Sequence, residues 1–233
     1  MSETAPNASR TAVRVEGLTL DRDGRRLFSG MSWSLAPGEL LAVTGPSGVG
    51  KSSLVSALAG MLEPAAGSIE RPAAVSSAGI VFQDLRLTKE LSVLTNVLCG
   101  KLGQFPWWRT LFGFPAGEKR AAFQKLEELE IAHLCHKPVR NISGGEQQRT
   151  AIARVLFQEP DVIFADEPTS NLDLALSERV MAMLRRECKT GGRSAICILH
   201  DTEFVGRYAD LELRLGREFP NGWELRRVAD TAA

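Results

Sequence analysis

Short apolar runs alternate with amphipathic stretches along most of the chain. A short apolar or alternating run predicts a strand, whereas apolar positions that recur at helical spacing predict a helix. The first pattern predicts strands at residues 13–20, 27–35, 40–44, 67–70, 79–82, 162–165, 194–199, 211–215 and 223–227. The second predicts helices at residues 51–59, 92–102, 118–129, 144–157, 174–189 and 202–208. Strands that alternate with helices indicate an α/β fold, in which ligands bind at the carboxyl ends of the parallel strands.

These elements divide the chain into one domain with an insertion. The domain is expected at residues 12–229, between a disordered tail at 1–11 and a short tail at 230–233. It opens with a small antiparallel hairpin, whose turn falls at residues 22–25 and whose second strand breaks near Gly30. Between residues 85 and about 141 the β-branched runs disappear and helical spacing dominates. This stretch is therefore predicted to be a helical subdomain inserted into the domain.

Within the predicted insertion, one helix is capped by Ser92, and another places Phe123, Leu126 and Leu129 on one side as a core face. Between the two helices, residues 105–115 are rich in aromatic side chains, although the whole chain is only 6% aromatic. Two interpretations stay open for these rings. They pack the two helices together, which is the commoner role of large aromatic residues, or some of them form an exposed docking surface.

Composition limits the partners that the chain can have. Lysine plus arginine and aspartate plus glutamate both number 28, so the formal net charge is zero and nucleic acid is not expected as a partner. The cysteines form no CxxC pair and are expected to be reduced thiols. Residues 1–11 lack the features of a secretory signal, and no apolar run reaches the ~20 residues that span a bilayer. Any role at a membrane must therefore come through a partner.

One glycine-rich stretch carries the most specific chemistry. A predicted strand, a loop and a predicted helix follow one another, and the loop and first helical turn read Gly45-Pro46-Ser47-Gly48-Val49-Gly50-Lys51-Ser52-Ser53. The glycines let backbone N–H groups approach phosphate oxygens, the lysine reaches the β- and γ-phosphates, and Ser52 offers a hydroxyl to Mg²⁺. The alternative, a glycine loop that merely joins a strand to a helix, fits this context less well. The stretch predicts a binding site for a nucleoside triphosphate.

Two carboxylates follow another buried strand. Asp166 and Glu167 come directly after residues 162–165, which places them at the same sheet edge as the phosphate loop. Asp166 is expected to hold Mg²⁺ beside Ser52, and Glu167 to polarise the attacking water. An acidic pair is common at the start of a loop or helix, but four preceding apolar residues favour the catalytic interpretation.

A second anion site is predicted at Ser143-Gly144-Gly145-Glu146. A serine followed by two glycines at a helix N-terminus exposes N–H groups, a hydroxyl and the positive end of the helix dipole. The same residues also make an ordinary helix start. One triphosphate does not need two such cradles from one chain, so a second subunit is expected to supply this one.

These motifs together resemble those of an ABC-type ATPase, over about residues 13–227. The matching positions are Gly45 to Ser52, Gln83, Ile142 to Glu146, Ile163 to Glu167, Ser170-Asn171-Leu172-Asp173 and His200. The resemblance implies a P-loop nucleotide-binding domain that hydrolyses ATP with Mg²⁺ and works as a dimer. It also implies that Gln83 is the glutamine-loop residue near Mg²⁺, that Asp173 lies in the loop between subunits, and that His200 contacts the γ-phosphate.

The insertion is similar to that of ATPases from phosphonate, phosphite or phosphate importers. This narrower resemblance rests on residues 91–98 and 107–113. It implies a transmembrane permease as partner, a periplasmic solute-binding protein as an indirect partner, and a location at the cytoplasmic face of the inner membrane. Three other classes remain open: an exporter ATPase of haem- or lipid-exporter type, a soluble ABC ATPase, and a P-loop small-molecule kinase.

The chain departs from the family pattern at a few positions. Arg22 stands where many relatives have an aromatic residue that stacks on adenine, and a guanidinium can also stack on a base. Ile142 and Glu146 replace the usual leucine and glutamine beside the Ser-Gly-Gly stretch. Asn171 stands where a small residue is commoner, and the sequence offers no physical reason for it.

Overall fold

The computed structural model describes residues 11–71, 78–105 and 113–228. Two sheets organise it: a six-stranded sheet in the order β5-β6-β7-β3-β8-β9 and a three-stranded sheet in the order β2-β1-β4. The strands are β1 (Val13–Arg22), β2 (Arg25–Leu35), β3 (Leu40–Thr44), β4 (Ala66–Glu70), β5 (Ala78–Val81), β6 (Val162–Asp166), β7 (Ser194–Ile198), β8 (Leu211–Leu215) and β9 (Trp223–Arg227). The helices are α1 (Lys51–Leu58), α2 (Val93–Leu98), α4 (Ala116–Glu128), α5 (Gly144–Gln158), α6 (Leu174–Lys189) and α7 (Thr202–Tyr208).

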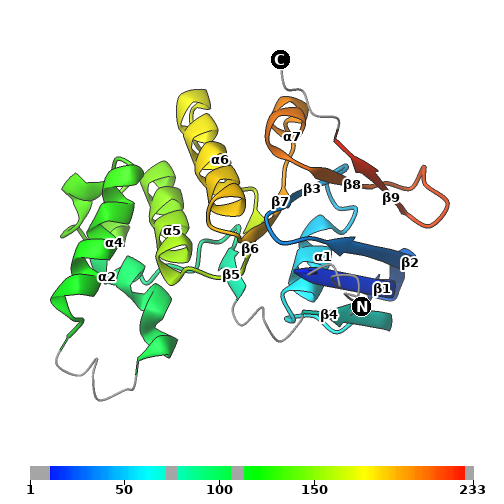
Figure 1. Cartoon of the computed structure of the whole chain (residues 1–233), viewed down its shortest axis with the longest axis horizontal. Coiled ribbons are helices and arrows are strands. Elements are labelled where there is room, and N and C mark those ends of the chain that lie inside the picture. The colour runs from blue at the N-terminus through cyan, green and yellow to red at the C-terminus, as the bar shows by residue number, and fades with distance from the viewer. Residues whose placement is uncertain (1–10, 72–77, 106–112, 229–233) are drawn as a thin grey trace, which may run out of the picture.

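The larger sheet is parallel from β5 to β8, and β9 closes it antiparallel to β8. Its central strands are buried on both faces, as expected for a parallel sheet covered by other elements. Alternate residues of β3 point into different cores: Leu40 and Ala42 into one, Leu41 and Val43 into the other. The first core contains the inward faces of α5 and α6, and the second contains α1 and the three-stranded sheet. Because β3 and β6 both run parallel to β7, which lies between them, their carboxyl ends lie at the same edge of the sheet. Figure 1 shows this sheet between the helices α5 and α6 and the smaller sheet.

The α/β fold predicted from the alternating elements is confirmed, but one detail of the smaller sheet differs from the prediction. The strand predicted to break near Gly30 is continuous, and Gly30 instead sits at a register shift with φ +62°. The strand after the first helix, for which the sequence assigned no neighbour, is β4, and it pairs antiparallel with β1. Local sequence cannot specify that partner, because the pairing joins segments on opposite sides of the phosphate loop.

Between residues 85 and 141 the described part of the chain contains helices and short 3₁₀ turns, which lie at one end of the molecule (Figure 1). Ser92 caps α2 as predicted, accepting a hydrogen bond from the Thr95 N–H at 3.1 Å. The helix does not continue through Leu102: α2 ends at Leu98, and a 3₁₀ helix, η1 (Cys99–Gln104), follows. The change falls where this segment approaches α5 closely, because a Cβ on Gly100 would lie 2.5 Å from the carbonyl oxygen of Arg154.

The predicted core face of α4 is confirmed, with Leu126 and Leu129 fully buried and Phe123 packed against the same core. The aromatic stretch predicted to join the helices lies mostly outside the described residues. The four cysteines are free thiols, and burial raises the pKa of Cys188 to about 12. Among the described helices, none combines the length and apolar character needed to cross a membrane.

Candidate functional site

The glycine-rich loop connects the end of β3 to the start of α1. Gly45 has φ +135°, and a Cβ there would lie 2.2 Å from the carbonyl oxygen of Leu215, so only glycine fits. Lys51 begins α1, and its Nζ donates to the carbonyl oxygens of Gly45 at 2.8 Å and Pro46 at 3.0 Å. Burial lowers the pKa of Lys51, while the charges of Glu167 and Asp166 oppose that shift. The loop thus holds the Lys51 ammonium group beside the anion site predicted from sequence.

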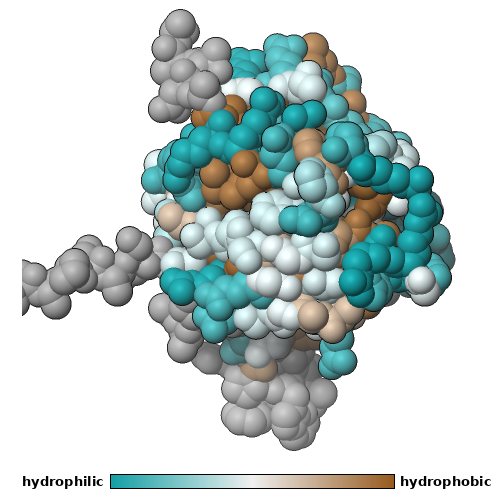
Figure 2. All heavy atoms as spheres, turned by 90° about the vertical axis from the view of Figure 1, so that its right-hand side faces the viewer, coloured by the Kyte–Doolittle hydropathy of each residue, from teal (hydrophilic) through white to brown (hydrophobic). Residues whose placement is uncertain are grey.

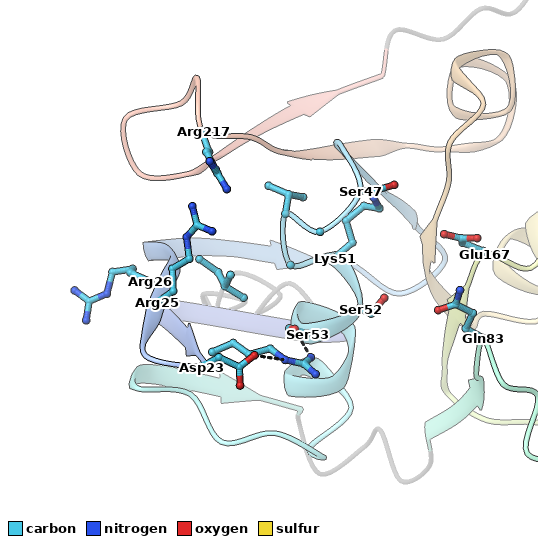
Figure 3. Close-up of a pocket in the computed structure, with 15 residues that line it drawn as sticks. Asp23, Arg25, Arg26, Ser47, Lys51, Ser52, Ser53, Gln83, Glu167 and Arg217 are labelled. Carbon is cyan, nitrogen blue, oxygen red and sulfur yellow. Dashed lines mark hydrogen bonds and ion pairs between the residues drawn. The ribbon is translucent and has the colours of Figure 1, made fainter.

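A cavity of about 710 Å³ opens over this loop. Gln83 and Glu167 lie at one end, the phosphate loop lies in the middle, and arginine side chains lie at the other end (Figure 3). The remaining lining comes from the β1–β2 hairpin and the first turn of α1, and the full set is Arg22, Asp23, Arg25, Arg26, Leu27, Ser47, Gly48, Val49, Gly50, Lys51, Ser52, Ser53, Gln83, Glu167 and Arg217. The structure therefore brings together most residues predicted to bind a triphosphate.

Asp166, the last residue of β6, is suited to hold a cation with Ser52. The Ser52 hydroxyl bonds to its carboxylate, and burial raises the pKa of Asp166. Its Oδ1 atom is buried and has no hydrogen-bond partner among the described residues. A divalent cation would satisfy that oxygen, and Mg²⁺ typically needs only one or two carboxylates when phosphates complete its shell. The residues present thus fit Mg²⁺ held partly by phosphates, since the described residues contain no group of three or more acidic, histidine or cysteine side chains that could hold a metal ion by themselves.

Glu167 lies at the junction of two cavities. Its Oε1 atom is 2.7 Å from His200 Nε2, so the imidazole holds the carboxylate in place. Its backbone has φ +54°, and its carbonyl oxygen accepts hydrogen bonds from Ser170 Oγ at 2.9 Å and Gln148 Nε2 at 3.2 Å. A second cavity of about 370 Å³ extends from Glu167 and His200 towards Leu174, whose side chain is 67% exposed. These hydrogen bonds to the Glu167 carbonyl stabilise a left-handed backbone conformation that is energetically unfavourable for a non-glycine residue.

Gln83 follows β5 and is carried by a turn with unusual geometry. Leu85 and Arg86, two and three residues after Gln83, have φ +57° and +43°, in the left-handed region that non-glycine residues rarely adopt. Arg154 of α5 donates from Nη2 to the Leu85 carbonyl at 2.8 Å and from Nη1 to the Arg86 carbonyl at 2.7 Å. The Arg86 guanidinium also lies 3.6 Å from the centre of the Phe82 ring. Gln83 is thereby attached to the helix that begins with the Ser-Gly-Gly stretch.

The Ser143-Gly144-Gly145 stretch lines neither cavity. Ser143 and Glu146 form a capping box, in which the Ser143 N–H donates to Glu146 Oε2 at 2.7 Å and the Glu146 N–H donates to Ser143 Oγ at 3.4 Å. These bonds from Ser143 hold the pKa of Glu146 below its usual value. A Cβ on Gly145 would lie 3.0 Å from the Asn171 carbonyl, so packing within the chain explains that glycine. A Cβ on Gly144 would meet nothing within 4 Å, so its lack of a side chain is not explained by contacts among the described residues.

Two loop residues receive a local explanation. Asp173 is the N-cap of α6 and accepts from the Leu176 N–H at 2.9 Å, and it lines neither cavity. Asn171, for which the sequence offered no reason, has φ +62°, and asparagine tolerates this left-handed conformation better than most residues.

The arginine end of the cavity holds one predicted residue and several that sequence reasoning missed. Arg22 lines the cavity as predicted, and its Nη1 donates to Ser53 Oγ at 2.9 Å. Arg25, Arg26 and Arg217 line it as well. For Arg25 and Arg26, the charged turn of the first hairpin was a signal in the sequence. Nothing in the sequence indicated Arg217, because β8 reaches the site only through its parallel pairing with β3.

The phosphate loop after β3 and the Asp166–Glu167 pair at the end of β6 lie at the same edge of one parallel sheet, with β7 between the two strands. Together with the separate Ser-Gly-Gly helix start, this arrangement is that of a P-loop ATPase of the ABC type. Comparison with known proteins identifies the family directly: the ABC transporter family matches residues 28–170, and the chain belongs to it as an ATP-binding subunit that hydrolyses ATP. The phosphonates import ATP-binding protein PhnC of Escherichia coli (strain K12) is 36% identical over 234 residues, covering 91% of this chain and 89% of that protein.

Two solved structures show the same fold. The cbiO1 protein from Clostridium perfringens, part of the ABC transporter complex cbiONQ, is 31% identical and has a TM-score of 0.72, with 88% of this chain and 84% of that chain covered. A dimeric ATP-binding cassette in a post-hydrolysis state, bound to ADP and Pi, has a TM-score of 0.80 at 23% identity and covers 93% of this chain and 98% of that chain.

Proposed function

We propose that this ATPase powers the import of phosphonates or closely related phosphorus oxyanions through a separate transmembrane permease. Two copies of the chain would act together at the cytoplasmic face of the inner membrane, with a periplasmic solute-binding protein as an indirect partner. The substrate class is supported by the 36% identity to a phosphonates import protein over 91% of the chain. The need for a permease is supported by the lack, among the described helices, of any that could cross a membrane.

The observation that carries the dimer is the position of Gly144. The Ser143-Gly144-Gly145 stretch lies outside the nucleotide cavity, and Gly144 faces open space. Packing gives no reason for glycine at Gly144, as is also true of Gly117. What distinguishes Gly144 is that it directly follows the Ser143 hydroxyl at a helix N-terminus, where N–H groups and the helix dipole attract anions. Close approach of a phosphate held by a second copy would supply the missing reason. Each triphosphate would then lie between the Lys51 loop of one copy and the Ser143 helix start of the other.

The roles proposed within one cavity follow from its geometry. Lys51 neutralises the β- and γ-phosphates, and Ser52 and Asp166 would hold Mg²⁺, which supplies positive charge to the phosphates when bound. Glu167 accepts a hydrogen bond from the water whose oxygen attacks the γ-phosphorus as the bond to the β–γ bridging oxygen breaks. His200 holds that carboxylate, and Gln83 lies beside it at the same end of the cavity. His200 is therefore proposed to position Glu167 as well as to contact the γ-phosphate.

The dimer is tested with the Glu167→Gln variant, which is expected to bind ATP without turning it over. Adding ATP should convert the purified variant from monomer to dimer, as measured by light scattering after size exclusion. In the same background, Gly144→Leu should keep ATP binding and lose the dimer. Gly117→Leu is the matched control, because Gly117 also lies in the first turn of a helix and its added Cβ meets nothing within 4 Å. A persistent dimer in Gly144→Leu would refute the composite site.

The substrate is tested separately with the native permease complex. The chain, purified from membranes in mild detergent, is expected to bring a multispanning protein with it. After reconstitution in proteoliposomes, methylphosphonate with the cognate binding protein should raise ATP hydrolysis, whereas sulfate should not. ATP-driven movement of solute in the opposite direction would favour the exporter alternative, and a chain that never enters a membrane complex would favour a soluble ABC ATPase.

A further inference from the structure

The two ends of the cavity are lined by different residues, and this difference indicates where a nucleobase would lie. Glu167 and Gln83 occupy one end, and the phosphate loop occupies the middle (Figure 3). If the γ-phosphate faces Glu167, as the proposed function requires, the ribose and base point to the opposite end. That end is formed by the β1–β2 hairpin and by Arg217, which follows β8. The two hairpins are in contact there, because Asn221 O accepts from the Ser29 N–H at 3.1 Å and Ser29 O accepts from Trp223 Nε1 at 3.0 Å.

Arg22 is not free to act as a stacking plane for the base. Its guanidinium donates to Ser53 Oγ at 2.9 Å, and Ser53 lies in the first turn of α1. That helix start is where the phosphates bind, because its unpaired N–H groups and positive dipole end attract anions. The hydrogen bond therefore places the Arg22 charge beside the phosphates. Its position in the hairpin suggested stacking, whereas its contact favours an electrostatic role.

The base end of the cavity contains no aromatic ring among the residues that line it. Its apolar side chains are Leu27 and Val49, and its polar groups are mainly guanidinium groups. Arg25 and Arg217 are exposed, and neither forms an ion pair within 4.0 Å with a described residue. Asp23 is the one acidic side chain at this end of the lining, and it already pairs with Arg22 at 3.8 Å. Figure 2, which views the molecule from the side of these hairpins, shows the hydrophobic atoms of this face in several separate areas among hydrophilic and intermediate ones.

Guanidinium groups can only donate hydrogen bonds, and this property distinguishes between purines. Guanine presents two neighbouring acceptors, O6 and N7, which arginine binds in a bidentate manner. Adenine presents an acceptor beside an amino donor, and arginine cannot satisfy that donor. An aromatic ring would instead contribute base stacking, which tolerates every base because each has a π-face. A cavity with free arginines and no ring therefore has no feature that selects adenine.

We propose that this chain binds GTP at least as tightly as ATP, with Arg25 and Arg217 contacting the base and Arg22 contacting the phosphates. The proposal deepens the proposed function and rests on it, since it concerns the nucleotide used at the same site. Its consequence is that guanosine triphosphate, as well as adenosine triphosphate, is a substrate of the ATPase.

Competition binding tests the base contacts. Radiolabelled ATP is held on the purified chain by filter binding in the presence of Mg²⁺ and displaced with unlabelled ATP, GTP or CTP. GTP should displace it at a concentration equal to or below that of ATP. The double variant Arg25→Gln/Arg217→Gln should weaken GTP at least fivefold more than ATP. The control Arg14→Gln/Arg227→Gln removes one arginine from each hairpin outside the cavity, and it should leave the ratio of the two affinities unchanged.

The results separate the two levels of the proposal. Wild-type binding of ATP at least twofold tighter than GTP would overturn the base assignment and leave the ATPase intact. Failure of every nucleotide to bind would overturn the site itself. For Arg22, the Arg22→Lys variant keeps the charge but not the planar group. It should bind ATP within about threefold of wild type, while Arg22→Ala loses about tenfold for ATP and GTP alike; equal losses in both variants would refute the phosphate role.

Discussion

Arg154 is expected to be the main support of the turn that carries Gln83. Its guanidinium donates to two backbone carbonyls, those of Leu85 and Arg86, both of which have left-handed backbone conformations. Replacing Arg154 with methionine keeps a stem of similar length, which packs near Gly100, but removes both hydrogen bonds. The change therefore isolates the polar contacts from the packing.

The magnitude follows from the two bonds. A hydrogen bond with a charged partner contributes about 1.5–3 kcal/mol, and the half-buried position of Arg154 places each bond at or below the lower end of that range. The Arg154→Met variant should therefore lose about 2–3 kcal/mol of unfolding free energy. In a domain of this size that corresponds to a melting temperature lower by about 4–12 °C. Arg154→Lys can satisfy one carbonyl with its ammonium group and should lose about half as much.

The assay is thermal unfolding followed by circular dichroism, combined with amide hydrogen exchange. Exchange should rise most at residues 83–87 in the Arg154→Met variant, because the strained turn would relax when its carbonyls are released. Arg140→Met is the control: Arg140 is exposed, and its substitution should change stability by no more than about 0.5 kcal/mol. A melting temperature of Arg154→Met equal to that of the control, or exchange that rises evenly over the whole chain, would refute the reasoning.

Two other substitutions test the energetic cost of the site. Burial raises the pKa of Asp166 above the ordinary value of 3.8 for an aspartate, so its carboxyl group stays protonated to a higher pH in the folded chain than in the unfolded chain. As the pH rises above 3.8, ionisation of this carboxyl group therefore lowers the stability of the nucleotide-free protein. Asp166→Asn should therefore raise the melting temperature at pH 7, by a gain that shrinks towards pH 4, and a gain independent of pH would contradict this account. Asn171 has φ +62°, so Asn171→Ala should cost about 1 kcal/mol in chemical denaturation while Asn171→Gly costs little; equal losses would show that the backbone conformation is not the cause.

The features that sequence predicted best are those in which a short segment contains its own chemistry. The phosphate loop needs glycines, a lysine and a serine within one short segment, and the helix start after Ser143 was predicted from a serine and two glycines in succession. Buried strands such as β6 are recognisable because both faces are covered, so that residues 162–165 are all apolar. These elements follow from local sequence, whatever their neighbours in space.

What sequence could not provide depends on contacts between distant segments. The pairing of β4 with β1, the 3₁₀ helix where Gly100 meets Arg154, and the arrival of Arg217 beside the first hairpin all join parts of the chain far apart in sequence. The role expected for Arg22 rested on a position in a pattern, whereas its hydrogen bond to Ser53 exists only in three dimensions. Contacts between distant segments therefore determine which residues surround the phosphate loop, whereas the loop itself could be predicted from local sequence.

Helix α5 is hydrogen-bonded to Glu167 and to the turn that carries Gln83, the two residues that would face the terminal phosphate. Through Gln148 it holds the backbone of Glu167, and through Arg154 it holds the turn after Gln83. The two attachment points are roughly 9 Å apart along the axis, at about 1.5 Å per residue, so a tilt of ~10° would displace one relative to the other by roughly 1.5 Å. That displacement is enough to stretch a 2.8 Å hydrogen bond beyond bonding distance. A small tilt of α5 about one attachment point would therefore break the hydrogen bond at the other, so both contacts are kept only while the helix holds its present direction.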